Sequence, residues 1–383
     1  MKKIVLTGGG TAGHVTPNIA LLPALQAAGY EIAYVGSYEG IEKKLIADFN
    51  IPYTGISTGK FRRYLDPKNF SDPFRVMKGF VEARNYLKNY QPDVVFSKGG
   101  FVSVPVVRAA ASLHIPCIIH ESDMTPGLAN KLCIPVAEKV CCNFPETMKN
   151  IPADKAVLTG SPIRAELAEG SKLAGLNMCG FTANKPVIMV IGGSLGAANV
   201  NKAVRDALPK LLEDFQVVHL CGKDKIDNLL LNTPGYKQFE YIKAELKDIF
   251  AMADVVISRA GANAICELLA LKKPNILIPL PAASSRGDQL LNAASFEAQG
   301  YSIVLNEDDI TTNLLVDKVH ELYFNRQNYV DAMSKSHQMD AVKTIMELIN
   351  AAADKALSNH FVYPRIFYSE FLANFSTGIE IRD

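Results

Sequence analysis

The sequence lacks several features that would place it in a functional class at once. Its 40 basic and 39 acidic residues leave a net charge of +1, which excludes the strong positive field that favours nucleic-acid binding. No apolar stretch approaches the roughly 18 residues that a membrane-spanning helix needs. The apolar run after Lys3 is too short for a signal peptide. We therefore expect any membrane contact to be made at the surface of a folded protein.

The cysteines do not form a recognisable framework. There are seven, and no two have the C-x-x-C spacing, which argues against both a disulfide set and a zinc site. A free cysteine among apolar residues behaves as a small core side chain. We therefore predict a protein of a reducing compartment, in which most of these residues are buried: Cys117, Cys133, Cys141, Cys142, Cys179, Cys221 and Cys266.

What the sequence does contain is an internal repeat. The first copy opens with a strand, a glycine loop and a helix, KKIVLTGGGTAGHVTPNIALLPAL, and the second opens in the same way with KPVIMVIGGSLGAANVNKAVRDALPKLL from Lys185. Further on, PDVVFSKGGFVSVPVVRAAA matches ADVVISRAGANAICELLALKK. This match aligns Asp93 with Asp254 and Lys98 with Arg259.

Two such copies in a chain of 383 residues predict two similar α/β domains. Short buried strands that alternate with helices form parallel sheets with helices on both faces. Ligands bind such sheets beyond the carboxyl ends of the strands, where the glycine loops stand here. We therefore expect two loop-lined sheet edges to face one cleft, with the joint between the domains near residues 160–184.

The first copy carries about 22 more residues than the second between its paired glycine positions, and the surplus lies around residues 55–90. That segment holds eight basic and three acidic residues, interleaved with aromatic side chains. Basic and aromatic residues together suit an anionic membrane surface. An amphipathic helix with its aromatic side chains in the core explains the pattern equally well.

The two glycine loops are candidate sites for anions. Backbone amides at a helix start attract phosphate groups, and a tight turn is the alternative for either loop. The first loop ends at His14, where the positive helix end favours a neutral imidazole that accepts a proton as a general base. The alternative is a histidine that only bonds the backbone. The second loop, from Gly192, contains Ser194 as a possible hydroxyl donor to phosphate.

Three further polar groups are candidates for sugar or nucleotide binding. His120-Glu121-Ser122-Asp123 ends a predicted strand, where the acids could orient a base or hold sugar hydroxyls, although a polar loop is equally plausible. Glu267 lies in an apolar helix and needs a partner, either a ribose diol or a basic neighbour. Asp288 and Gln289 could bracket two sugar hydroxyls or cap a helix.

These loops, in this order, resemble the MurG family, which adds N-acetylglucosamine to lipid I in peptidoglycan synthesis. The resemblance covers about residues 1–350. It rests on GGGTAGHVTPNIA, FSKGGFVSVP, HESDMTPGLANK, GSPIR, IGGSLGAANVN, RAGANAICE and RGDQLLNA. It implies two Rossmann-like domains of the GT-B type that face a deep cleft. The implied limits are 1–162 for the acceptor and membrane domain, 163–340 for the UDP-sugar domain, and 341–383 for a helix that packs back on the first domain plus a tail of unknown role.

The resemblance also implies roles for individual residues. His14 is the base that activates the 4-hydroxyl of the muramic acid sugar for inverting attack, and Glu121 supports the base or the acceptor. Glu267 binds the ribose, and the backbone of Ile242 pairs with uracil. The implied donor-binding residues are Thr11, Ala12, Gly13, Asp123, Arg164, Ser194, Ile242, Ala262, Asn263, Ala264, Ile265, Cys266, Glu267, Asp288 and Gln289.

The acceptor's lipid would lie against the basic and aromatic segment, on the cytoplasmic face of the membrane. The implied membrane and acceptor residues are Phe61, Arg62, Arg63, Phe74, Arg75, Lys78 and Phe80. The implied partners are UDP-N-acetylglucosamine, lipid I and an anionic membrane surface, with no nucleic acid. Because no D-x-D triplet occurs, we expect no obligatory metal, with helix ends and arginine stabilising the diphosphate instead.

The chain departs from the common family pattern at several positions, namely Phe101, Ser122, Asp123, Ser161 and Asp288, and in its aromatic end after residue 355. Four alternatives therefore stay open. The acceptor could be another lipid such as diacylglycerol. The enzyme could be a UDP-N-acetylglucosamine 2-epimerase. A nicotinamide oxidoreductase is disfavoured, because no acid follows the second strand to bind ribose. A non-catalytic nucleotide-sugar binder is the fourth.

Overall fold

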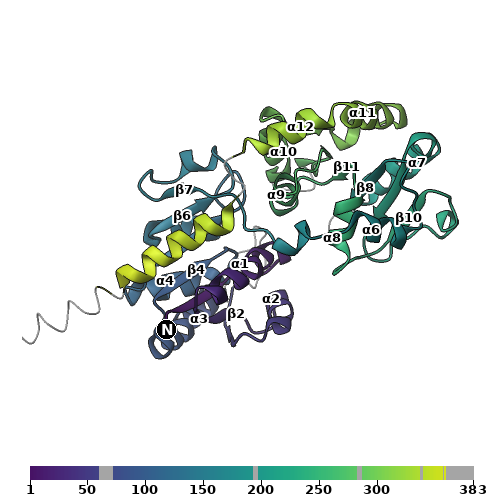
Figure 1. Cartoon of the computed structure of the whole chain (residues 1–383). Helices are drawn as coiled ribbons and strands as arrows, with labels where there is room; N and C mark the ends of the chain where they lie inside the picture. Colours follow the sequence, from purple (N-terminus) through teal and green to yellow (C-terminus); the bar gives the residue numbers. More distant parts are fainter. Residues whose placement is uncertain (60–71, 193–196, 283–286, 337–339, 357, 359–383) are drawn as a thin grey trace, which may run out of the picture.

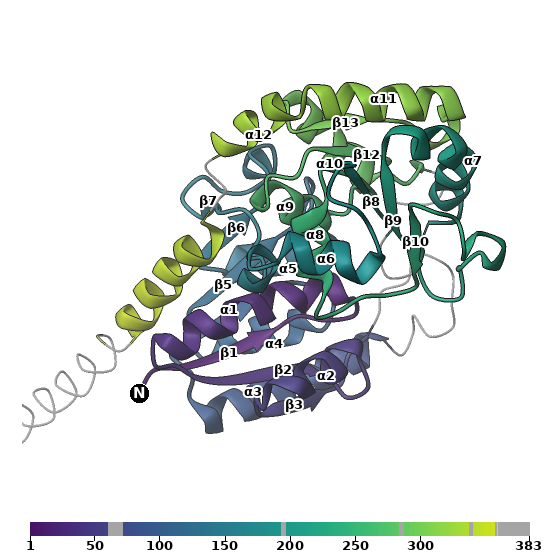
Figure 2. The same cartoon turned by 45° about the vertical axis from the view of Figure 1, so that its right-hand side comes forward.

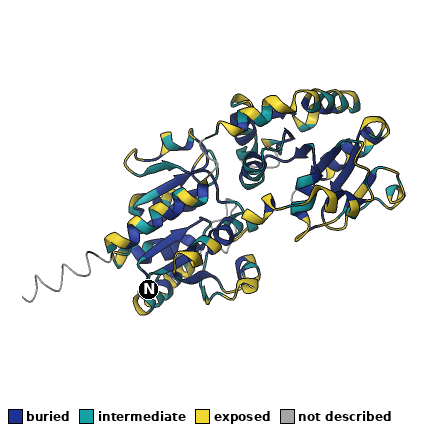
Figure 3. Cartoon of the chain, in the orientation of Figure 1, coloured by how far each residue is buried: buried dark blue, intermediate teal, exposed yellow. Residues whose placement is uncertain are grey.

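The computed structural model describes residues 1–59, 72–192, 197–282, 287–336, 340–356 and 358. They form two lobes, each built on a parallel sheet with helices on both faces (Figure 1). The sheets are buried and the exposed residues lie on the outer sides of the helices (Figure 3). No helix in these ranges is long and apolar enough to cross a membrane.

In the described part of the first lobe, seven strands form one sheet in the order β3-β2-β1-β4-β5-β6-β7. All neighbouring pairs are parallel. The strands are β1 (Lys3–Thr7), β2 (Glu31–Ser37), β3 (Tyr53–Ile56), β4 (Val94–Ser97), β5 (Cys117–Glu121), β6 (Lys139–Cys142) and β7 (Ala156–Leu158). The helices are α1 (Thr16–Ala27), α2 (Ile41–Ile46), α3 (Asp72–Tyr90), α4 (Ser103–Ser112) and α5 (Leu128–Cys133).

Alternation along the strands divides the first lobe into two cores. Val5 of β1 packs with the residues of α3 and α4 on one face. Its neighbours Ile4 and Leu6 pack with α1 on the other face. Successive side chains of a strand point to opposite faces, so a strand with three consecutive apolar residues, such as Ile4, Val5 and Leu6 of β1, supplies both cores at once. This pattern is the one expected of a sheet covered by helices on both sides.

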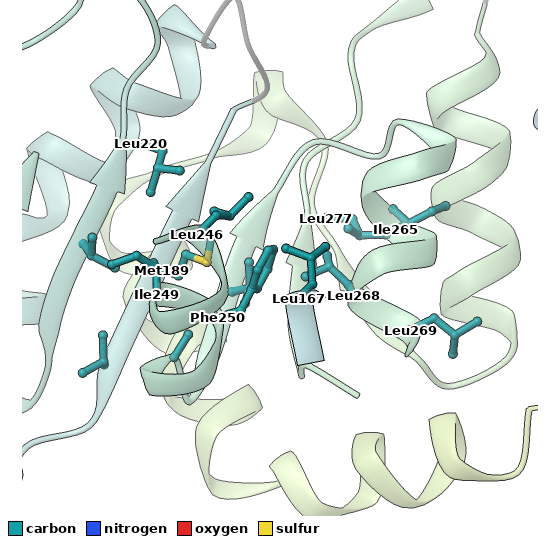
Figure 4. Close-up of a cluster of buried hydrophobic side chains, with 14 of the residues drawn as sticks. Leu167, Met189, Leu220, Leu246, Ile249, Phe250, Ile265, Leu268, Leu269 and Leu277 are labelled. Atoms are coloured by element: carbon teal, nitrogen blue, oxygen red, sulfur yellow. The ribbon is translucent and has the colours of Figure 1, made fainter. Parts of the chain in front are cut away.

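The second lobe repeats this arrangement, with its described strands in the order β10-β9-β8-β11-β12-β13. The strands are β8 (Val187–Ile191), β9 (Gln216–Leu220), β10 (Tyr236–Phe239), β11 (Val255–Ser258), β12 (Asn275–Leu277) and β13 (Ser302–Val304). The helices are α6 (Lys172–Cys179), α7 (Ala198–Asp214), α8 (Leu246–Met252), α9 (Ala262–Ala270), α10 (Asp288–Ala298), α11 (Thr312–Phe324) and α12 (Arg326–Ser334). Figure 4 shows the core between this sheet and helices α8 and α9.

The predicted repeat is confirmed by equivalent contacts in the two sheets. The strand order 3-2-1-4-5 of the first lobe recurs as 10-9-8-11-12 in the second. The aligned acids do the same work: Asp93 accepts a hydrogen bond of 2.6 Å from the backbone N–H of Lys3, and Asp254 accepts one of 2.8 Å from Val187. Each acid therefore joins the start of two neighbouring strands.

The chain leaves the first lobe after β7, which ends at Leu158, within the region where the joint was predicted. The residues that follow already belong to the second lobe, because Leu167, Leu176 and Cys179 are buried in its core. The last described helix, residues 341–356, lies back on the first lobe (Figures 1 and 2). Its Ile345 and Ile349 are buried beside α1, and Asn350 accepts a hydrogen bond of 2.8 Å from the Tyr30 hydroxyl.

The seven cysteines all lie in the described ranges. Each is buried and has a free thiol, as the apolar context of these residues predicted.

Candidate functional site

The first glycine loop follows β1 and is held by a buried carboxylate. The Glu42 side chain accepts hydrogen bonds from the backbone N–H groups of Gly10, at 3.1 Å, and Ser37, at 2.9 Å. A Cβ on Gly9 would stand 2.4 Å from the Glu42 carboxyl carbon, so any other residue would displace the carboxylate. Gly10 has a φ of +84°, a conformation that favours glycine. The Glu42 carboxylate therefore fixes the conformation of the loop.

His14 closes this loop in a single 3-10 turn, Ala12–His14. The α-helix begins two residues later, at Thr16, so His14 precedes the first α-helical turn rather than lying in it as predicted. Its Nδ1 is 3.0 Å from the Thr11 hydroxyl, in a hydrogen bond. This contact orients the ring.

The segment after β5 is organised by Glu121. Its carboxylate accepts hydrogen bonds from the backbone N–H of Asp123 (2.9 Å), the N–H of Gly127 (3.1 Å) and the Asn130 side chain (2.8 Å). Glu121 is 4 % exposed. Its two oxygens thus shape the loop and the start of α5. The Glu121 carboxylate therefore holds groups of its own lobe.

Helix α9 begins where the glycine loop of the first lobe reaches the second lobe. The Asn263 side chain donates a hydrogen bond of 2.8 Å to the Gly13 carbonyl, and the Ser161 hydroxyl donates one of 3.5 Å to the Asn263 side-chain oxygen. A single asparagine thereby contacts the glycine loop and the joint between the lobes.

Glu267 lies one turn further along α9, beside Arg164. The nearest nitrogen of Arg164 is 3.9 Å from the Glu267 carboxylate. Both side chains line a small pocket between the lobes, together with Thr16 and Pro17 of α1. Burial raises the pKa of Glu267 to about 7, and the charge of Arg164 opposes this rise. The carboxyl therefore changes charge near neutral pH, which suits a group that binds hydroxyls.

Helix α10 brings three further polar residues to the same edge of the second lobe. Gln289 accepts a hydrogen bond of 3.0 Å from the backbone N–H of Leu280. The Asn292 side chain donates a hydrogen bond of 3.2 Å to the Ala260 carbonyl and lies beside the Asp123 carboxyl of the other lobe, whose pKa it lowers. Burial, Glu121 and Asp288 raise the pKa of Asp123 to about 6.

Comparison with known proteins identifies the family of the chain. The glycosyltransferase family 28 N-terminal domain matches residues 4–142, and the C-terminal domain of that family matches residues 187–349. The chain is 65% identical over 349 residues to the UDP-N-acetylglucosamine--N-acetylmuramyl-(pentapeptide) pyrophosphoryl-undecaprenol N-acetylglucosamine transferase of Lachnospira eligens. That match covers 91% of this chain and 99% of the relative.

The chain belongs to the MurG family of glycosyltransferases.

Two more MurG-family proteins support the assignment. The relative of the same name from Lachnoclostridium phytofermentans is 64% identical, over 91% of this chain and 98% of its own length. The crystal structure of Acinetobacter baumannii MurG superposes with a TM-score of 0.73 at 28% identity, over 92% of this chain and 100% of that one. The fold is the two-domain GT-B fold that the resemblance implied.

The structure gathers many of the residues that the MurG resemblance singled out. His14 and Thr11 lie in one hydrogen-bonded turn, Gly13 contacts Asn263, and Arg164 lies beside Glu267. Helix α9 also carries Ala262, Ala264, Ile265 and Cys266, of which Ala264 is partly exposed and the other three are buried. Ile242 is buried in the core that α8 and α9 cover. Ser194 lies outside the described residues.

Residues 60–71 of the predicted membrane segment are not described, so Phe61, Arg62 and Arg63 lie outside the description. Helix α3 divides the remaining side chains between two faces. Phe80 packs against the core. Phe74 is 78 % exposed, Arg75 is exposed, and Lys78 lies on the surface with Glu82 3.7 Å away. One face of α3 thus packs on the core, and the other face is exposed.

Three polar residues of this region received no role in the sequence reading. The sequence assigned no role to Glu42 or Asn292, and it indicated Lys98 only as the repeat partner of Arg259. Each is buried, with a side-chain contact to a distant segment.

Proposed function

We propose that this chain transfers N-acetylglucosamine from UDP-N-acetylglucosamine to the 4-hydroxyl of the muramic acid sugar in lipid I, forming lipid II. The observation that carries this proposal is the 65% identity, over nearly the whole length of both chains, with a relative of that activity. The polar residues at the facing edges of the two lobes support it, because they supply a base, a cation and carboxyls within one region.

In this proposal the second lobe holds the donor. Glu267 accepts hydrogen bonds from the ribose hydroxyls, and Arg164, now 3.9 Å from Glu267, turns toward the diphosphate as its negative charge develops. The start of α9 adds backbone N–H groups to the same region. The backbone of Ile242 pairs with the uracil, and Asp288 and Gln289 hold the sugar.

The first lobe supplies the base. His14 takes the proton of the acceptor hydroxyl at Nε2, while its Nδ1 stays with the Thr11 hydroxyl. The hydroxyl oxygen attacks the anomeric carbon from the face opposite UDP, so that the C–O bond to UDP breaks as the new bond forms and the configuration inverts. Thr11, Ala12 and Gly13 close over the donor, and the contact of Gly13 with Asn263 draws the lobes together.

The test is transfer of labelled sugar from UDP-N-acetylglucosamine to a short-chain lipid I analogue, without added metal. His14→Asn keeps a polar side chain but removes the base, and we expect kcat to fall about 10²- to 10⁴-fold. His114→Asn is a matched control, because His114 is exposed and has a φ of +57°, which asparagine tolerates. Transfer by the His14→Asn variant at the wild-type rate would refute this role of the base.

The same assay separates the competing activities. Transfer to diacylglycerol but not to the lipid I analogue would reassign the acceptor. Conversion of the donor to UDP-N-acetylmannosamine, detected by NMR without any acceptor, would identify a 2-epimerase. Tight UDP binding with neither product would leave only a nucleotide-sugar binder.

We further propose that α3 faces an anionic membrane. Its exposed side chains combine apolar residues, Phe74, Met77 and Val81, with Arg75 and Lys78. The expected result is sedimentation with vesicles that contain anionic lipid, weakened in a Phe74→Ser/Met77→Ser double variant. Lys149→Ser on the same lobe serves as a surface control. Equal sedimentation of both variants would contradict this orientation.

A further inference from the structure

Lys98 is a buried cation with two side-chain partners on one neighbouring segment. It follows β4 and is 1 % exposed. Its ammonium group lies 2.9 Å from Nδ1 of His120 and donates to the Ser122 hydroxyl. The other ring nitrogen of His120, Nε2, lies 2.9 Å from the Gly160 carbonyl. Because a carbonyl only accepts, Nε2 carries the ring hydrogen and Nδ1 accepts from Lys98.

The ammonium group is surrounded by groups from four elements. His120 and Glu121 face it from β5, Asp123 from the loop that follows, Cys141 from β6, and Cys266 from α9 of the other lobe. Burial lowers the pKa of Lys98 to about 8, and the two carboxyls oppose this effect. Burial and the neighbouring ammonium together push the pKa of His120 well below its ordinary value. In this cluster, Lys98 is therefore the group that changes charge just above neutral pH.

Lys98 is too deeply buried to touch a substrate, but the segment it holds is not. Ser122 stands between Glu121, which shapes the loop, and Asp123, which meets Asn292 of the second lobe. The Asn143 side chain fixes the same segment from the other side, through a hydrogen bond of 3.0 Å to the Ser122 carbonyl. Through His120 and Gly160, the same cluster also reaches the joint between the lobes.

We propose that Lys98 is a positioning residue of the transfer reaction, whose charged ammonium group holds Ser122, and with it Asp123, against the second lobe. This inference rests on the proposed function. Loss of the proton leaves a neutral amine without the positive charge. Its hydrogen bonds to Ser122 and His120 weaken, and the carboxyls of Glu121 and Asp123 lose their neighbouring cation, so the segment shifts and the lobes lose their alignment. A misplacement of about 1 Å in such a segment is enough to lower a rate about 10²-fold.

The experiment is a pH–rate profile of the full chain, with kcat and KM for UDP-N-acetylglucosamine measured separately between pH 6 and 10. For the wild type we expect a fall of kcat with a midpoint near pH 8. Lys98→Arg keeps a permanent charge, so its midpoint moves up by at least one pH unit. Lys98→Met lowers kcat about 10- to 100-fold, leaves KM within about twofold, and has no fall near pH 8.

Two further variants serve as controls for this test. Lys139→Met removes a partly exposed lysine of β6, which donates to the Asp154 carbonyl, and its profile matches the wild type. Ser122→Ala removes the hydroxyl that Lys98 holds, so kcat drops and the fall near pH 8 becomes smaller. A Lys98→Met variant with wild-type kcat, or a Lys98→Arg profile that still falls near pH 8, overturns the inference while leaving the proposed function intact. A wild type that makes no lipid II overturns both.

Discussion

A methyl group added to Gly13 would stand 2.9 Å from the side-chain nitrogen of Asn263 in the other lobe. This approach is closer than real Cβ atoms make, and Asn263 would have to move and give up its hydrogen bond of 2.8 Å to the Gly13 carbonyl. The glycine of the first loop and the asparagine of α9 therefore fit each other across the two lobes.

This fit predicts coupling between the two positions. Gly13→Ala should lower kcat/KM at least tenfold in the wild-type background. In an Asn263→Ala background, which has already lost the contact, the same change should cost much less. The measurement is a double-mutant cycle on kcat/KM, in which contacting residues show interaction energies of about 0.5–3 kcal/mol. Strictly additive losses would show that the two residues act independently.

Glu42 should be essential for the shape of the first glycine loop. Glu42→Gln keeps the size of the side chain but replaces one accepting oxygen with an amide nitrogen, which cannot accept, so the hydrogen bond from the N–H of either Gly10 or Ser37 is lost. We expect the free energy of unfolding to fall by about 1–3 kcal/mol, and kcat to fall with it because His14 follows the loop. Denaturant unfolding and the transfer assay measure both effects. Glu39→Gln, on an exposed neighbour, should change neither quantity.

Glu267 should make ligand binding release protons. Its pKa is raised to about 7 in the free protein, so at pH 6.5 most molecules carry a neutral carboxyl. Ribose hydroxyls donate to the ionised form and favour it. Titration calorimetry of UDP in two buffers of different ionisation enthalpy should therefore report proton release at pH 6.5. Glu267→Gln should abolish it, and an unchanged release in that variant would assign the proton to another group.

The same carboxyl should make the ligand-free protein less stable as the pH rises. A pKa raised above the ordinary 4.5 means that the folded state favours the protonated form. The stabilisation is complete below about pH 4.5 and is lost as the pH rises through about 7. Urea unfolding at pH 6 and pH 8 should therefore differ less in Glu267→Gln than in the wild type. An identical pH dependence of both proteins would argue against the raised pKa.

The fold was predictable because its indications are local and repeated. Apolar strands followed by glycine loops identify βα units from neighbouring residues alone, and the second copy repeats the first. Even the alignment of Asp93 with Asp254 identified two side chains with equivalent contacts. The orientation of helix α3 was harder to predict. Its periodicity shows two faces but does not show that Phe80 points inward and Phe74 outward.

The site was predictable only in part, because several of its contacts join distant segments. Glu42 reaches Gly10 only after β2 has paired with β1. Lys98 meets Ser122 because β4 and β5 are neighbours in the sheet. The residues that adjoin Glu42 and Lys98 in the sequence do not indicate that these two charged side chains are buried. Contacts of this kind depend on which strands are neighbours in the sheet. That order is set by the folding of the whole chain and cannot be inferred from the residues next to Glu42 or Lys98.

The helix of residues 341–356 has a consequence for how the chain is made. Its Ile345 and Ile349 belong to the core that begins with Ile4 and Leu6, so the first lobe is interrupted by the whole of the second. During synthesis the first lobe keeps part of its apolar face uncovered until almost the entire chain has left the ribosome. The second lobe, whose strands and helices are continuous in sequence, can finish folding before the lobe that was begun first.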